Sequence, residues 1–171
     1  AHWLIVALFA LQYAAGLTMT RLAEDERALG LSGDDLYNWH KTLGLVALAV
    51  AVLRLASRHV GALPPWAPTL SEGERRFVHR AEQVLYAAMF VMPVSGFVYV
   101  MAGDYGVMFA GAWEVPNPLP RSEGLAAVAR WVHIGGAIVL AVALAGHLGL
   151  VLRHTLWLRD GLIWRMLPRR R

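Results

Sequence analysis

The stretch from Arg130 to Arg153 constrains this chain more than any other. The about 22 residues between these arginines include no Asp, Glu, Lys or Arg, and as a helix they can cross the ~30 Å hydrocarbon core of a bilayer. His133 and His147 lie inside the stretch, fourteen residues apart. Fourteen residues fall ~40° short of four turns and span ~21 Å, so the two rings share one face at two depths. Because an ionisable side chain inside a membrane helix points to a functional site, we predict a spanning helix with two sites, each completed by another helix.

Three further apolar segments have the length of a membrane span. The four predicted helices cover about residues 3–20, 36–56, 84–102 and 131–152. Only 16% of the residues are charged, against about 25% in soluble proteins, and these charges gather between the apolar segments. The chain has no cysteine, which excludes disulfides and thiolate-bound iron–sulfur clusters. We therefore predict an all-α integral membrane protein, a four-helix bundle that forms a single domain over residues 1–171.

The distribution of Lys and Arg predicts the orientation of the bundle, because cytoplasmic connections carry more of them. The connection between the second and third segments and the tail, with their helix ends, hold eleven, whereas the other two connections hold five. We therefore expect both termini to face the cytoplasm. The outer face carries eight acidic residues, for a net charge of −3. The terminal arginines are expected to contact anionic lipid, and we expect no nucleic-acid partner.

On this topology the histidines can be sorted by depth. His40 begins the second segment at the outer level, where His133 also lies, and His2 begins the first segment at the inner level, which His147 can share. A ring-sized cofactor between helices needs one axial imidazole from each side, and two imidazoles leave no open position on a haem iron. We therefore predict two b-type haems, an outer one held by His40 and His133 and an inner one held by His2 and His147.

Neither a clustered metal site nor simple packing accounts for these histidines as well as haem does. Zinc or copper would require three or four clustered ligands, often including a carboxylate or a cysteine, whereas these histidines come in twos. A single membrane histidine can be a hydrogen-bonded core residue, but four that pair by depth are hard to explain in this way. Several glycines near the histidines would make room for a flat macrocycle, although helix packing explains glycines in membrane helices equally simply. They are Gly44, Gly136, Gly146 and Gly149.

At these positions the chain resembles the prokaryotic cytochrome b561 family. The resemblance rests on Ala1-His2-Trp3, Trp39-His40 with Gly44, Arg54 and Arg58, Leu85-Tyr86, Pro93-Val94-Ser95-Gly96, the spacing of His133, His147 and His154, and Arg165–Arg169. It implies a four-helix bundle in a bacterial inner membrane, with two b haems and the ligand pairing given above. It also places His154 near a quinone. In the superoxide oxidase branch, which is the closest resemblance, electrons pass from superoxide outside to ubiquinone in the membrane. Glu82 departs from that branch, which tends to carry a histidine there.

Arg153 and His154 are the candidates for a quinone site at the inner membrane edge. A quinone carbonyl needs a hydrogen-bond donor and a proton route, and histidine suits both because it titrates near neutral pH. The alternative is that Arg153 is an anchor that extends to the interface and that His154 contacts lipid headgroups. The sequence leaves both roles open.

The outer charge bears on the electron donor. Superoxide is an anion, so an enzyme that collects it should present a positive surface, whereas the net negative face suits a basic redox protein. Lys41, Arg121 and Arg130 could still form a local positive funnel. Two functions therefore follow: a superoxide:ubiquinone oxidoreductase, or a non-enzymatic electron-transfer subunit of a larger membrane redox complex. In both, a dihaem cytochrome b transfers electrons between an outer-face partner and the quinone pool.

Overall fold

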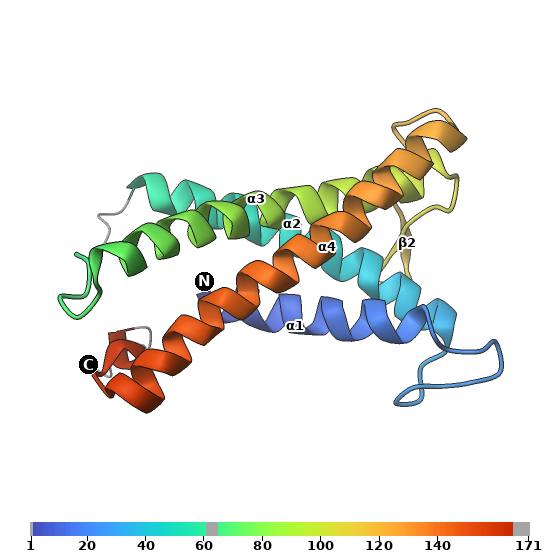
Figure 1. Ribbon diagram of the computed structural model, residues 1–171. Helices are drawn as coiled ribbons and strands as arrows, with labels where there is room; N and C mark the ends of the chain where they lie inside the picture. Colours follow the sequence, from blue (N-terminus) through green and yellow to red (C-terminus); the bar gives the residue numbers. More distant parts are fainter. Residues whose placement is uncertain (1, 61–64, 166–171) are drawn as a thin grey trace.

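The computed structural model describes residues 2–60 and 65–165, and four long helices dominate it (Figure 1). All four are long and apolar enough to cross a membrane, which confirms the predicted fold class. The basic tail at residues 166–171, expected at the lipid surface, lies outside the described residues. The elements are α1 (His2–Met19), α2 (Gly33–Val60), α3 (Glu72–Ala102), β1 (Met108–Phe109), β2 (Trp113–Glu114) and α4 (Glu123–Leu152), followed by a π-helical segment (Arg153–Leu158) and a 3-10 turn (Leu162–Arg165).

α3 begins more than three turns before the predicted third span, which starts near residue 84. α3 begins at Glu72 because Ser71 and Glu74 form a capping box. The Ser71 hydroxyl accepts a hydrogen bond from the backbone N–H of Glu74 at 3.3 Å, and the Glu74 carboxylate accepts one from the N–H of Ser71 at 2.9 Å. Such reciprocal caps satisfy backbone donors at a helix start. The polar run expected in a loop is therefore helical.

The fourth helix also begins earlier than predicted, at Glu123 rather than near residue 131. The Ser122 hydroxyl caps it by accepting from the N–H of Leu125 at 3.3 Å. Both differences have one cause: apolar residues mark the part of a helix inside the bilayer, whereas caps mark its full length. Each predicted span lies within one of the four helices, except that residue 20 follows the end of α1.

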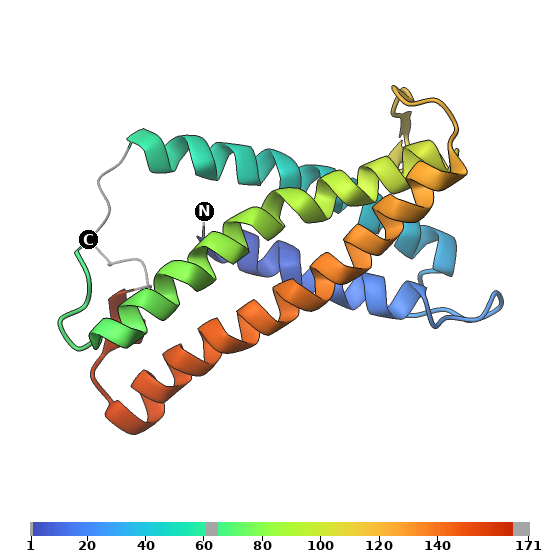
Figure 2. The same cartoon turned by 45° about the horizontal axis from the view of Figure 1, so that its top comes forward.

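The helices form an open bundle of two pairs. α3 packs along α4, α1 packs against α2, and α2 also contacts α3. Both views show α3 and α4 running together towards the hairpin (Figure 2). The α1–α2 connection and the β1–β2 hairpin lie at one end, while the start of α1 and the end of α4 lie at the other (Figure 1). Between the pairs, the hydroxyl of Tyr13 in α1 donates to the carbonyl of Ala137 in α4 at 2.5 Å.

The antiparallel hairpin and its flanking loop close the end of the bundle that the charge pattern predicts to face outwards. The Lys41 ammonium donates to the carbonyl of Gly106 at 3.0 Å, and the Thr42 hydroxyl accepts from the N–H of Ala110 at 2.9 Å. Beneath this loop Met101 and Ala102 have no exposed surface. Elsewhere the spans expose large apolar side chains, as expected for helices that face lipid. The loop is thus fixed to α2 beside His40.

Candidate functional site

The structure brings His40 of α2 and His133 of α4 together at the outer level. Their ring centroids are 6.1 Å apart and the ring planes are nearly perpendicular, at 84°. Bonds from imidazole nitrogen to a metal are about 2.0–2.1 Å long, so two rings on opposite sides of one iron have centroids roughly 6 Å apart. The spacing of the two side chains therefore fits the axial positions of a single haem iron.

Contacts with α3 orient the His133 ring. Its Nδ1 lies 2.9 Å from the carbonyl oxygen of Met92 and 3.3 Å from the hydroxyl of Ser95. The Ser95 hydroxyl itself donates to the Met92 carbonyl at 3.1 Å. A carbonyl only accepts, so Nδ1 carries the proton and Nε2 keeps its lone pair for a metal. Hydrogen bonds of this kind fix the tautomer and orientation of metal-binding histidines. Sequence reasoning missed Ser95 because its role depends on α3 lying beside α4.

Two glycines allow the rings to lie against neighbouring helices. A Cβ atom at Gly96 would lie 3.1 Å from Cε1 of His133, and one at Gly16 would lie 3.5 Å from Cε1 of His40. By contrast, a Cβ at Gly136 or Gly146 would meet Met92 or Phe77 of α3, so these two serve helix packing. Neither Gly16 nor Gly96 is among the four glycines that the sequence suggested would make room for a macrocycle.

At the inner level, His2 begins α1 and His147 lies in α4. The two rings are close enough to interact electrostatically, and the guanidinium of Arg54 in α2 is within the same range of His2. The His2 ring also packs edge-on against Trp3, with centroids 5.3 Å apart. Side chains from three helices thus lie near one another at this level, with one histidine from α1 and one from α4.

The donor set fits haem better than a clustered metal site. Within residues 2–60 and 65–165, no group of three or more His, Cys, Asp and Glu side chains could hold a metal ion. His40 and His133 instead face each other across two helices. The Nδ1 atom of His40 is buried without a hydrogen-bond partner in the described part of the chain. In contrast to the His133 ring, the His40 ring therefore has no hydrogen bond at Nδ1 within the described residues.

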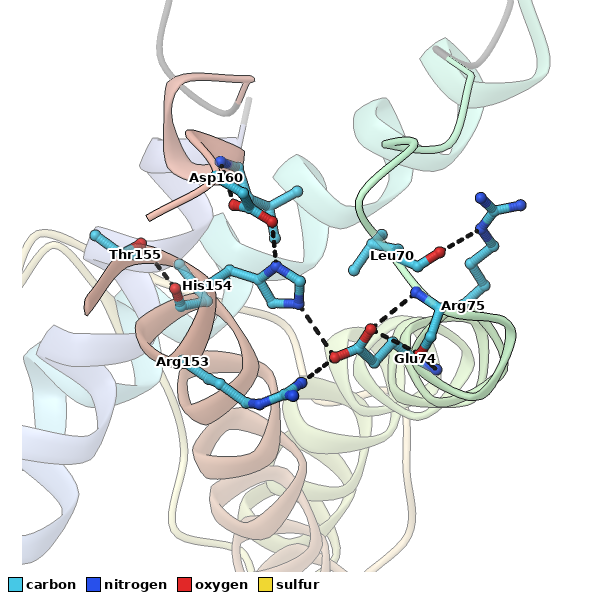
Figure 3. A network of polar contacts seen from close by, with 10 residues as sticks. Leu70, Glu74, Arg75, Arg153, His154, Thr155 and Asp160 are labelled. Atoms are coloured by element: carbon cyan, nitrogen blue, oxygen red, sulfur yellow. Dashed lines mark hydrogen bonds and ion pairs between the residues drawn. The ribbon is translucent and has the colours of Figure 1, made fainter. Parts of the chain in front are cut away.

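The two quinone candidates lie together in a charged network at the inner end (Figure 3). His154 has no exposed surface. Its Nδ1 lies 2.5 Å from Oδ2 of Asp160, and its Nε2 lies 3.2 Å from Oε1 of Glu74. Arg153 forms an ion pair with the same Glu74 carboxylate. His154 therefore does not contact lipid headgroups, and both of its ring nitrogens are engaged. The hydrogen bond from His154 lowers the pKa of Asp160.

This network joins distant parts of the chain. Glu74 caps α3, His154 belongs to the π-helical segment after α4, and Asp160 follows Arg159, whose φ of 50° is left-handed. Beside the network, Leu162 packs against Ala67 and Leu70, next to Leu150 of α4. The carboxylate partners were not predicted, because residues 72–82 were placed in a loop and the π-helical segment has no clear sequence signal. We call Glu74, Arg153, His154 and Asp160 the inner-end network.

Comparison with known proteins gives a consistent result over the whole chain. The family model described as prokaryotic cytochrome b561 matches residues 1–169. A protein of Escherichia coli (strain K12) named Cytochrome b561 homolog 2 is 24% identical over 166 residues, which are 97% of this chain and 86% of that relative. The matched range spans the positions of both histidine pairs and of the inner-end network.

Proposed function

Because the chain belongs to the prokaryotic cytochrome b561 family, we propose that it is a dihaem cytochrome b that moves single electrons between an outer-face redox partner and the quinone pool. Membership of the family implies haem b and electron transfer in a bacterial membrane. The number of haems, the quinone and the outer partner are our proposal. Haem iron supplies reversible one-electron chemistry when it is bound.

The facing pair His40 and His133 is the observation that carries this proposal. A centroid distance of 6.1 Å leaves room for one metal between the rings and none for a substrate on the same axis. We assign His2 and His147, the latter about four turns further along α4 than His133, to the second haem. Two imidazole pairs without an open coordination position suit electron transfer rather than oxygen or substrate binding.

We propose that quinone binds at the inner end, close to the inner histidine pair. Arg153 supports this, because 55% of its side chain is exposed although it is paired with Glu74. His154 cannot reach a quinone directly while both ring nitrogens are bonded, so we assign it to the proton route behind Arg153. Quinone reduction requires protons, and the histidine with its two carboxylates offers groups that exchange them.

The charge pattern supports an orientation with the inner-end network towards the cytoplasm. The helix ends and connections there hold eleven of the 16 Lys and Arg residues, and positive residues accumulate on the cytoplasmic side. In this orientation the hairpin and the α1–α2 connection face outwards. The electron donor then approaches from the side of His40 and His133.

A basic redox protein fits the outer face better than superoxide does. The face has a net charge of −3, and the three cations of the expected funnel are each engaged elsewhere. Lys41 donates to the carbonyl of Gly106, Arg121 is 3.8 Å from Glu123, and Arg130 stacks on Trp131. Superoxide:ubiquinone oxidoreduction remains the second proposal, because it is the activity of the branch that the sequence resembles. Purified protein mixed with superoxide and a short-chain quinone separates the two.

The experiment that tests the main proposal is a pyridine haemochrome assay with a protein determination. Two haems b per chain are expected, one for each histidine pair. A ratio of one haem per chain would mean that only one of the two histidine pairs holds a haem. Reduction of a quinone analogue by the protein, after its haems have been reduced chemically, tests the acceptor in the same preparation.

A further inference from the structure

Arg54 repeats on α2 the spacing that places the two histidines on α4. It follows His40 by fourteen residues, just as His147 follows His133. On a helix this spacing returns a residue to almost the same face, ~21 Å further along the axis. Since His40 faces α4 at the outer level, Arg54 faces the same interior at the inner level. Its electrostatic interaction with His2 agrees with this placement.

The surroundings of Arg54 hold its guanidinium inside the bundle. The group lies 5.5 Å from the ring centroid of Tyr86 in α3, within cation–π range. The preceding Leu53 is 69% exposed, so the lipid-facing side of α2 lies next to it, and Arg54 itself is half-buried. An arginine that turns away from lipid in a spanning helix is costly unless an anion meets it.

Arg58, on the next turn of α2, is an arginine whose charge is paired within the protein. Its guanidinium lies 5.0 Å from the centroid of the same Tyr86 ring and forms an ion pair with Glu82. Arg54 has no carboxylate partner in the described part of the chain. The two arginines therefore share one aromatic ring, but only one of them has a counter-charge from the protein.

We propose that Arg54 binds a carboxylate of the inner haem, one of its two propionates. The inference rests on the proposed inner haem and adds the residue that neutralises it. Guanidinium groups bind carboxylates through two parallel hydrogen bonds, which fix orientation as well as charge. His2 and His147 then hold the iron, while Arg54 fixes how the haem is turned between them. The shared chemistry is an anionic oxygen group, for which a lipid phosphate is the competing source.

The first test compares Arg54→Gln with the double variant Arg58→Gln/Glu82→Gln in the purified haem-loaded protein. Arg54→Gln removes one positive charge beside Tyr86. The double variant removes one positive and one negative charge there, so the net charge does not change. A nearby cation favours the reduced haem, which carries one more electron. Arg54→Gln should therefore lower the midpoint potential of the inner haem, leave the outer haem unchanged, and release the inner haem several-fold faster in detergent. The double variant should keep both potentials.

The Arg54→Lys variant and the spectrum of the outer haem distinguish loss of the guanidinium from a folding defect. The lysine variant keeps the charge, so it should recover most of the potential but less of the haem retention. An intact outer haem shows that the bundle has formed. An inner potential that does not move in Arg54→Gln, with two haems bound, overturns the assignment. A haem-to-protein ratio of one in the wild type would instead defeat the proposed function.

Reconstitution with haem dimethyl ester identifies the anion. The esterified propionates carry no charge and cannot pair with a guanidinium, so the wild type and Arg54→Gln should then release the inner haem equally fast. A difference that persists with the ester would assign Arg54 to a lipid phosphate and would overturn the proposal. Agreement between the two proteins confirms that the guanidinium acts through the propionate.

Discussion

The outer and inner levels of the bundle hold their histidine pairs in different ways. At the outer level Ser95 and the Met92 carbonyl orient His133, Gly96 lets its ring approach α3, and the hairpin is bonded to Thr42, two residues after His40. At the inner level His2 lies in the first turn of α1, and the guanidinium of Arg54 interacts with it electrostatically. Neutral hydrogen bonds thus orient one ring of the outer pair, whereas a cation acts on His2 at the inner level.

The largest predicted effect is the loss of a whole haem, which tests whether the two outer histidines share one metal position. His40→Ala and His133→Ala should each remove the outer haem and leave roughly half of the haem content, because both rings face one metal position. Difference spectra and haem-to-protein ratios measure this. Variants that lose different haems, or none, would show that the facing rings do not share an iron.

The next prediction separates the two histidines at the inner end. His147→Ala should remove the inner haem, while His154→Ala should leave both haems bound, because the His154 ring nitrogens are bonded to carboxylates. The two residues lie seven apart, on the same side of the helix and ~10 Å from each other. A full haem complement in His147→Ala would mean that His154 serves as the ligand.

How far the sequence predicts these sites depends on how regular the backbone is. The pairing of His40 with His133 follows from helical rise and depth alone, because both helices are regular over the spans. The partners of His154 depend instead on a capping box and a π-helical segment. Ser95 depends on which helix lies beside α4. These last features require the tertiary arrangement, which residue spacing does not provide.

The inner-end network should affect stability more than haem content. His154→Ala removes the donor between two carboxylates and leaves Glu74 and Asp160 in repulsion, so the thermal midpoint should fall by several degrees. His79→Ala is the matched control, since His79 is an exposed histidine on α3. Thermal melting of the haem-loaded proteins measures the difference. Equal midpoints for the two variants would show that the network does not hold the inner end together.

Acidity tests the same network without a mutation. The His154 hydrogen bond lowers the pKa of Asp160, so its stabilisation is complete above the ordinary carboxyl pKa. That stabilisation is lost as the pH falls through the lower, folded value. Wild-type stability should therefore drop more steeply below pH ~4 than that of Asp160→Asn. Parallel acid profiles for the two proteins would contradict the assigned bond.

A smaller effect is expected from the hydrogen bond between Ser95 and His133 at the outer level. Ser95→Ala removes one of two acceptors around the Nδ1–H of His133, which makes the ring a weaker electron donor to a metal. The outer midpoint potential should rise, and the inner one should not. Ser95→Thr keeps the hydroxyl and should restore the wild-type value. A potential that falls, or one that is not restored by threonine, would assign Ser95 to packing alone.

The smallest expected effect is the salt dependence of electron entry, and its sign identifies the class of donor. Exposed charges act over about 10 Å at 0.1 M salt, and the outer face carries a net charge of −3. Reduction of the outer haem by a small cationic redox protein should therefore slow as salt increases, because screening removes the attraction. Reduction by superoxide should instead become faster, because screening removes a repulsion.

Arg121→Gln and Arg130→Gln make the face more negative, so they should accelerate the cationic donor at low salt. Rapid reduction by superoxide that slows with salt and with both substitutions would show that these arginines guide an anion to His40 and His133.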